Sequence, residues 1–144
     1  MTDSLPLEAS RDVYRSCFCL HAQRAARAVA RRFDEAFRPL DLTSGQFSLL
    51  HSLNRSEVAT VGRVAALLAM DRTTVTANLK PLERRGLVEA RPDPADARSR
   101  QLFLTASGHA LLRQAMPIWA AVQAELTAAV PDAARLRSDL RGLG

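Results

Sequence analysis

The chain lacks any long apolar run. Its longest stretch without Asp, Glu, Lys or Arg is Leu42–Asn54, which is 13 residues, whereas a membrane-spanning helix needs about 20. The first residues also lack a basic segment followed by an apolar one, the pattern of a secretory signal peptide. We therefore expect a cytoplasmic protein that does not enter a membrane.

The motifs of common enzymes are missing as well. The six glycines never form GxGxxG or GxxxxGK, and no HExxH, GxSxG or paired CxxC sequence occurs. Only two cysteines are present, Cys17 and Cys19, and residues two apart cannot bridge each other in regular structure. Cys17 and His21 have the spacing of metal ligands on one helix face, but two ligands do not make a site. We expect no enzymatic activity, no cofactor and no metal.

Lysine is nearly absent. Of the 20 basic residues only Lys80 is a lysine, and the 15 acidic residues leave a net charge of +5. Arginine suits phosphates and base edges better than lysine does, although a GC-rich genome favours arginine without any such function. The length of 144 residues and the hydrophobic content of 47% predict one ordinary globular domain.

The hydrophobic pattern predicts a mainly helical fold with one small β-hairpin. One long helix is expected over 12–37, because apolar residues recur there at three- and four-residue steps. Five further helices are expected, starting at Thr43, Thr60, Asp71, Thr105 and Pro131. Extended runs over 87–91 and 100–104 predict a hairpin with a long polar loop over 92–99. The terminal helices carry apolar stripes too long for the middle of the chain to cover, which favours a homodimer.

The segment 60–85 has the pattern of a helix-turn-helix. Ala65 is small enough for the place where two helices cross, and Val75 would anchor the second helix to the first. The opposite face of the second helix is polar or basic and almost free of acids; it consists of Arg72, Thr73, Thr74, Thr76, Ala77 and Lys80. Such a helix fits the major groove of DNA, where Thr and Arg contact base edges. The alternative is an ordinary helical hairpin with a solvated polar face.

The expected hairpin adds basic residues beside this helix. Arg98 would lie at the tip of its loop, with Arg91 and Arg100 nearby. An arginine on a projecting loop fits a minor groove, and Asp96 would hold the tip in shape by pairing with Arg98. The alternative is a surface hairpin whose solvated ion pair contributes little.

Three segments carry a resemblance to a known family: 42–47, 71–88, and the sequence D-x-R-x-x-x-L-x-L-T-x-x-G from Asp96 to Gly108. In them the chain resembles the winged helix-turn-helix of the MarR family of bacterial transcriptional regulators. The resemblance implies a single domain over 1–144, with a DNA-binding part over 42–105 and dimerisation helices over 8–40 and 105–144. It also implies a homodimeric repressor of pseudo-palindromic operators in double-stranded DNA, released by a small lipophilic or phenolic ligand.

The resemblance also assigns DNA contacts, with the recognition helix in the major groove and Arg98 in the minor groove. The expected contacts are Arg72, Thr73, Thr74, Thr76, Lys80, Arg84, Arg98 and Arg100, with Asp96 stabilising the wing. Pro81 departs from the family pattern, because it removes one backbone donor inside the recognition helix. It leaves the roles of Arg84 and Arg85 open.

Two sensing hypotheses stay open at this point. A ligand pocket between the DNA-binding and dimerisation parts would use His21, Phe47, His51 and Trp119. A thiol switch would use Cys19 or Cys17, because one branch of the family senses organic hydroperoxides through a cysteine near the start of its first helix.

Two tyrosines that the resemblance would place near the thiol are missing, which counts against the thiol hypothesis. Gln23 and Phe33 occupy the positions where that branch has tyrosines, so the activating hydroxyls are missing. The alternative is that both cysteines are small hydrophobes on a packed helix. A rival class of function is a helical interaction module that binds protein and not DNA.

Overall fold

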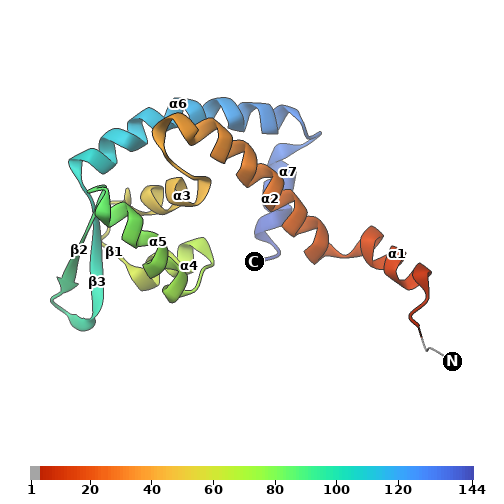
Figure 1. The fold of residues 1–144 in the computed structure, drawn as a ribbon, viewed down its shortest axis with the longest axis horizontal. Helices are drawn as coiled ribbons and strands as arrows, with labels where there is room; N and C mark the ends of the chain where they lie inside the picture. Colours follow the sequence, from red (N-terminus) through yellow and green to blue (C-terminus); the bar gives the residue numbers. More distant parts are fainter. Residues whose placement is uncertain (1–3) are drawn as a thin grey trace.

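The computed structural model describes residues 4–144 and is mainly helical, with one small antiparallel sheet (Figure 1). The elements in chain order are α1 Leu7–Ser16, α2 Phe18–Phe37, the short 3-10 helix η1 Arg38–Leu40, α3 Ser44–Leu53, β1 Ala59–Thr60, α4 Val61–Leu68, α5 Arg72–Arg84, β2 Val88–Asp93, β3 Asp96–Leu104, α6 Ala106–Ala128 and α7 Ala133–Arg141. Helix α6 runs across the top of Figure 1, and α2 packs against it and slopes down toward α1, which projects at one end. The sheet and α3–α5 lie below the other end of α6. Within 4–144, no helix combines the length and the apolar character needed to cross a bilayer.

The N-terminal helix is interrupted, so the expectation of one helix over 12–37 was wrong. Cys17 leaves the helical conformation with ψ of 109°, and its Sγ accepts a hydrogen bond from the Leu20 amide at 3.5 Å as the cap of α2. In the residue just before the break, the Ser16 hydroxyl donates to the Asp12 carbonyl at 2.6 Å, a side-chain bond that competes with helix continuation. No core contact holds α1 in line with α2, because α1 buries no residue.

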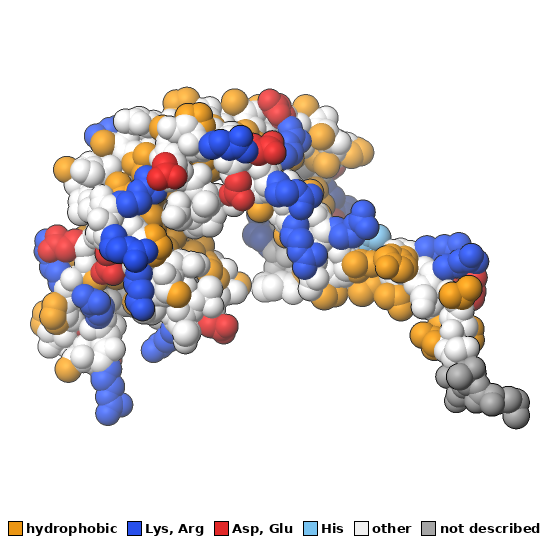
Figure 2. All heavy atoms as spheres, in the orientation of Figure 1, with side chains coloured by type: hydrophobic (Ala, Val, Ile, Leu, Met, Phe, Trp, Pro, Cys, Tyr) orange, Lys and Arg blue, Asp and Glu red, His pale blue; other side chains and the backbone are white. Residues whose placement is uncertain are grey.

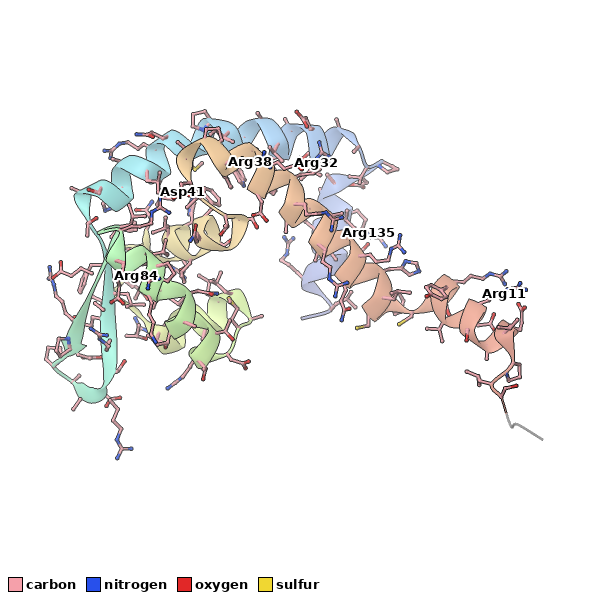
Figure 3. The ribbon with its side chains drawn as sticks, in the orientation of Figure 1. Arg11, Arg32, Arg38, Asp41, Arg84 and Arg135 are labelled. Atoms are coloured by element: carbon pink, nitrogen blue, oxygen red, sulfur yellow. The ribbon has the colours of Figure 1, made fainter. Side chains whose placement is uncertain are left out.

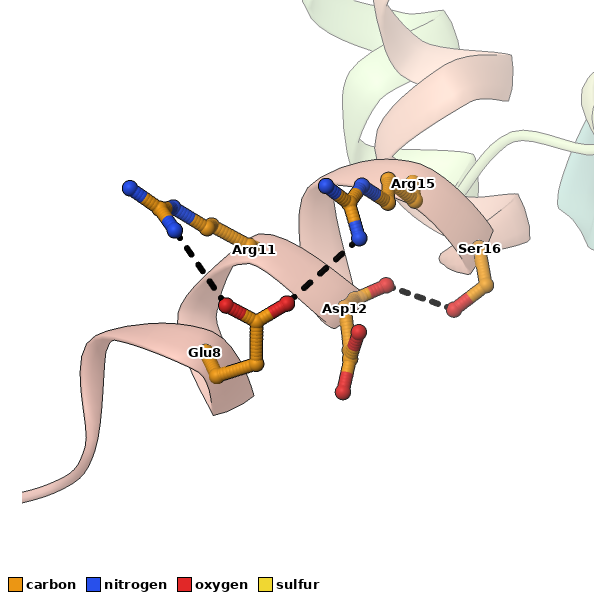
Figure 4. Close-up of polar contacts among 5 residues, drawn as sticks. All are labelled: Glu8, Arg11, Asp12, Arg15 and Ser16. Atoms are coloured by element: carbon orange, nitrogen blue, oxygen red, sulfur yellow. Dashed lines mark hydrogen bonds and ion pairs between the residues drawn. The ribbon is translucent and has the colours of Figure 1, made fainter.

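The charged side chains of helix α1 pair with one another along its surface (Figure 4). The Glu8 carboxylate accepts from Arg11 at 3.2 Å and from Arg15 at 3.5 Å. Each of these side chains is more than half exposed, so the two pairs contribute little to stability. The large apolar side chains of α1 stay exposed in this single chain; they are Leu7, Val13 and Tyr14.

The helix caps predicted from the sequence are largely confirmed. Thr43 forms a full capping box with Gln46, and the Thr60 and Thr105 hydroxyls accept from the amides three residues on. Asp71 stands at the cap of α5, but its carboxylate makes no capping hydrogen bond. The last helix starts at Ala133, capped by Asp132, and not at Pro131 as expected.

A single core joins the helix-turn-helix to α2, α3 and α6. Val75, Leu79 and Leu82 of α5 are buried as predicted, and buried Val64 and Ala65 face them from α4. The turn between α4 and α5 is made by Ala69, which takes a left-handed conformation with φ of 51°. On the other side of the core, a stack of three aromatic rings connects α2 to α3; its members are Phe33, Phe37 and Phe47.

The sheet has the order β1-β3-β2, and its strands run further than expected. The predicted loop over 92–99 is wrong, because β2 and β3 leave only Pro94 and Ala95 between them. The register explains the misreading: Pro92 pairs with Arg100, but Asp93 pairs with Asp96. Residues 97–99 therefore have no partner on β2, which is a bulge with the composition of a loop.

The sequence T-x-x-G joins the wing to α6. The Thr105 hydroxyl donates to the Gly86 carbonyl at 2.6 Å while it caps α6, and the Thr105 amide donates to the Leu87 carbonyl at 3.1 Å. Gly108 passes so close that a Cβ there would lie 2.2 Å from the Leu87 oxygen. This part of the family motif therefore fixes the end of α5 to the start of α6.

Candidate nucleic-acid interface

The recognition helix α5 presents the predicted polar face to solvent. Its residues Arg72, Thr73, Thr74, Thr76 and Lys80 are all exposed. The Thr76 hydroxyl donates to the Arg72 carbonyl at 2.9 Å, which leaves the hydroxyl oxygen free to accept a hydrogen bond. The face therefore offers hydroxyl, methyl and cationic groups, which are the groups that read base edges and phosphates.

Arg72, the first residue of α5, has its side chain close to the start of α4. A Cβ built on Gly62, in the first turn of α4, would lie 2.9 Å from Arg72 Nη2, 3.3 Å from its Cζ and 3.5 Å from its Nε. All three atoms belong to the guanidinium group, so this group lies beside Gly62, in the space that a side chain there would need. Sequence reasoning missed the contact, because nothing in the pattern around Gly62 indicates what faces it.

The far end of α5 carries Arg84 and Arg85, which have different surroundings. The helix continues through Pro81 to Arg84, and Arg84 is exposed where α5 approaches the base of the wing (Figure 3). Arg85 donates to the Asp41 carbonyl at 2.6 Å and to the Leu40 carbonyl at 3.3 Å. Arg85 therefore joins the end of the recognition helix to the turn that follows α2. Along the helix, Arg84 lies about 18 Å from Arg72, so the structure does not bring these two predicted contacts together.

Arg98 lies in the wing, in the unpaired stretch of β3 and not at a loop tip. Its amide donates to Asp96 Oδ1 at 2.9 Å, and the Ala95 amide donates to Asp93 Oδ1 at the same distance. Asp96 thus shapes the tip through the backbone, and among residues 4–144 no ion pair joins it to the Arg98 guanidinium. The Arg98 side chain is exposed, and Figure 2 shows basic side chains projecting beyond this lower edge of the molecule.

The two faces of the wing differ in their arginines. Arg100 pairs across the sheet with Pro92 and shares a face with the buried Leu102, on the side of the helices. Arg91 lies on the other face, where its guanidinium is 4.6 Å from the Phe103 ring centroid and pairs with Glu89 at 2.9 Å. The hydrogen bond and charge of Arg91 lower the pKa of the Glu89 carboxyl. Arg91 is therefore an internal partner of the wing and is turned away from Arg100.

Three of the four expected pocket residues meet in one groove. Phe47, His51 and Trp119 line a cavity of about 510 Å³ between α3, α4 and α6. The His51 ring meets the Phe47 ring edge-on, with centroids 5.3 Å apart. His21 lies elsewhere, on α2, with its Nε2 3.3 Å from the Arg15 carbonyl, so it does not belong to this groove.

The cysteines lie at the break between α1 and α2. Cys17 is half-buried at the cap of α2, and Cys19 is exposed, with its Sγ 3.2 Å from the Gln23 amide nitrogen. The helix face that Cys17 and His21 were expected to share does not exist, because Cys17 lies outside α2. In residues 4–144 no group of three or more His, Cys, Asp or Glu side chains is arranged to hold a metal ion.

Comparison with known proteins agrees with this architecture. A family model described as MarR family matches residues 40–99. The chain is 30% identical over 102 residues to the organic hydroperoxide resistance transcriptional regulator of Bacillus subtilis, in a match that spans 71% of this chain and 68% of that protein. This chain belongs to the MarR family.

Solved structures extend the likeness over almost the whole chain. The M. tuberculosis transcriptional regulator MosR in complex with DNA is 41% identical, with a TM-score of 0.83 over 89% of this chain and 93% of that one. A cysteine-to-serine mutant of E. coli MarR complexed with operator DNA is 25% identical, with a TM-score of 0.80 over 97% and 99%. Against the curated sequences the matches span only 48–68% of each relative's length. The relatives named here are transcriptional regulators, so MarR-family membership agrees with the expectation of a non-enzymatic protein.

Proposed function

We propose that this MarR-family chain is a cytoplasmic, homodimeric repressor that binds a pseudo-palindromic operator in double-stranded DNA. One observation carries the proposal: the exposed face of α5 and the wing arginine Arg98 occur on one winged helix-turn-helix, with the buried sides of both elements fixed by a single core. The recognition helix would enter the major groove and Arg98 the adjacent minor groove. Two similar structures were solved with DNA bound, which supports the proposal.

The second copy is proposed from the terminal helices. Large apolar side chains stay exposed along α1, the start of α2 and α7, including Leu7 at 78% and Phe18 at 81%. Neither α1 nor α7 buries a single residue. A surface of this kind is costly in water and is usually covered by a partner, and a second copy would also give the two recognition helices that a palindrome requires.

The groove between α3, α4 and α6 is the proposed effector site. Its lining is mostly apolar and aromatic, with Phe47, Trp119 and Met116, while His51 and Ser48 provide polar contacts at its side. A small lipophilic or phenolic molecule matches this combination. Because the groove joins α6 to α3 and α4, a bound molecule would act on the angle between the dimerisation helices and the DNA-binding part.

A binding measurement tests the proposal. The full-length protein is titrated by fluorescence anisotropy into its own upstream intergenic DNA and into a scrambled duplex, at 50 and 200 mM salt. We expect tighter binding to the intergenic DNA and a fall of about a hundredfold or more between the two salt concentrations. Failure to bind either duplex would favour the rival helical interaction module.

A thiol-based repressor is the second candidate. The observation that favours it is the exposure of Cys19 beside half-buried Cys17 at a break in the helix, together with the likeness to a regulator named for organic hydroperoxide resistance. Cumene hydroperoxide would then release DNA from the wild type and not from the Cys17→Ser/Cys19→Ser variant. Equal release from both proteins would eliminate this candidate.

A further inference from the structure

Two helices of the DNA-binding part begin in the same way. In both α3 and α4 a threonine caps the helix and a glycine stands two residues later: Thr43 and Gly45 in α3, Thr60 and Gly62 in α4. Around Gly45 there is room for a side chain, because the nearest atom to an added Cβ is the Thr43 hydroxyl oxygen at 4.0 Å. At Gly62, by contrast, an added Cβ would lie only 2.9 Å from Nη2 of Arg72.

The contact at Gly62 fixes Arg72 without any hydrogen bond. A guanidinium group packs well with its flat face on another group, and a hydrogen atom in place of Cβ allows it to approach the backbone of α4 directly. An alanine would push the guanidinium away, since Nη2 and Cζ would both be too close to the new methyl group. Only the end of a flexible side chain has to move, so the fold itself would not be strained.

The position of the guanidinium also bears on what it binds. In a helix-turn-helix the first helix crosses the DNA backbone, while the N-terminal residues of the second reach the base edges. Arg72 starts at the first residue of α5 but turns back over the first turn of α4. On a helix-turn-helix docked in that way, its charge would lie toward the DNA backbone and apart from Thr73 and Thr76.

We propose that Gly62 is a positioning residue that seats the Arg72 guanidinium on α4, so that Arg72 binds a DNA phosphate and not a guanine. The proposal rests on the DNA binding proposed above and adds a role that changes the sequence-based expectation for Arg72. Gly62 leaves room for the Arg72 rotamer that lies beside α4. The guanidinium is then in place before DNA arrives, and this lowers the entropy cost of the phosphate contact.

The test is a double-mutant cycle on the full-length protein, with Gly62→Ala, Arg72→Ala and the double variant, and with Gly45→Ala as the matched control. Binding to intergenic and scrambled duplexes is measured at several salt concentrations. We expect Arg72→Ala to weaken binding to both duplexes by about tenfold and to lower the salt slope by about one. Gly62→Ala should weaken binding by about threefold in the wild-type background, with no effect in the Arg72→Ala background.

Thermal unfolding separates an effect on stability from an effect on DNA binding. Alanine is a better helix former than glycine, so Gly62→Ala and Gly45→Ala should both raise Tm by about 2–5 °C, while only Gly62→Ala loses affinity. A loss of discrimination between duplexes in Arg72→Ala, unchanged affinity in Gly62→Ala, or a Gly62→Ala effect that persists without Arg72 would overturn the proposal. If the wild type binds neither duplex, the proposed function itself has failed, and the two failures are thereby distinguished.

Discussion

At the base of the wing, one residue determines how closely α6 packs against the segment that follows α5. Gly108 passes so near the Leu87 carbonyl that a Cβ would lie 2.2 Å from its oxygen. The obstacle is backbone, so relief requires α6 to move away from the wing. Glycine is needed at position 108 because the helix passes close to the Leu87 carbonyl, and not because of its backbone dihedral angles.

Gly108→Ala should therefore destabilise the protein although it replaces glycine inside a helix. We expect a loss of about 1–3 kcal/mol in the free energy of unfolding, measured by urea denaturation. Gly45→Ala, also in the first turn of a helix, has space around it and should be slightly stabilising, because alanine is the better helix former. If both variants were equally stable, the close approach would not constrain the fold.

The Glu89–Arg91 pair on the outer face of the wing gives a prediction about pH. Arg91 lowers the pKa of the Glu89 carboxyl from its ordinary value of 4.5. A group whose pKa is lower in the folded state stabilises the fold above its unfolded pKa, and this contribution disappears as pH falls through the folded value. Carboxyl NMR titration should show a Glu89 pKa below 4.5 in the wild type that returns toward 4.5 in Arg91→Ala; no change on substitution would refute the pairing.

At the scale of elements, the wing places its arginines on different sides. Arg98→Ala should weaken binding to specific and random duplexes alike, by about tenfold, because a minor-groove arginine of this kind reads the backbone and groove width. Arg91→Ala is the internal control, since Glu89 and Phe103 hold Arg91 on the face of the wing opposite Arg100. It should change affinity less than about twofold in the same titrations. Equal losses in the two anisotropy titrations would contradict the assignment of faces.

The elements also show what the sequence can and cannot predict. Caps were read correctly at Thr43, Thr60 and Thr105, because a capping residue acts on amides only three positions away. The buried side of α5 followed from its periodicity, as Val75 and Leu79 demonstrate.

Features that depend on contacts between distant parts of the chain could not be predicted from the sequence. The bulge over 97–99 looked like a loop, because its pairing depends on the register of two strands. The break at Cys17 was hidden by apolar residues that keep their spacing through it. Gly62 and Arg85 were missed for the same reason, since their partners lie on other elements.

At the scale of the whole molecule, the chain is elongated, with the winged part at one end and α1 at the other (Figure 1). Substitution of Phe18, 81% exposed in this single chain, should leave the monomer fold intact. Phe18→Asp is expected to convert a dimer into a monomer in sedimentation velocity and to abolish tight binding to a two-half-site operator, because the two sites are then bound independently. Val58→Asp, exposed on the loop after α3, is the control and should remain a dimer.

The outer strand of the wing has a further consequence. Because β3 lies between β1 and β2, β2 is an edge whose unpaired backbone groups could accept a strand from a neighbouring molecule. Pro92 has no amide hydrogen to donate there, and charged Glu89 and Arg91 occupy the same strand, which are features that discourage edge-to-edge association. The wing can therefore project far into solvent without becoming a seed for aggregation when no DNA covers it.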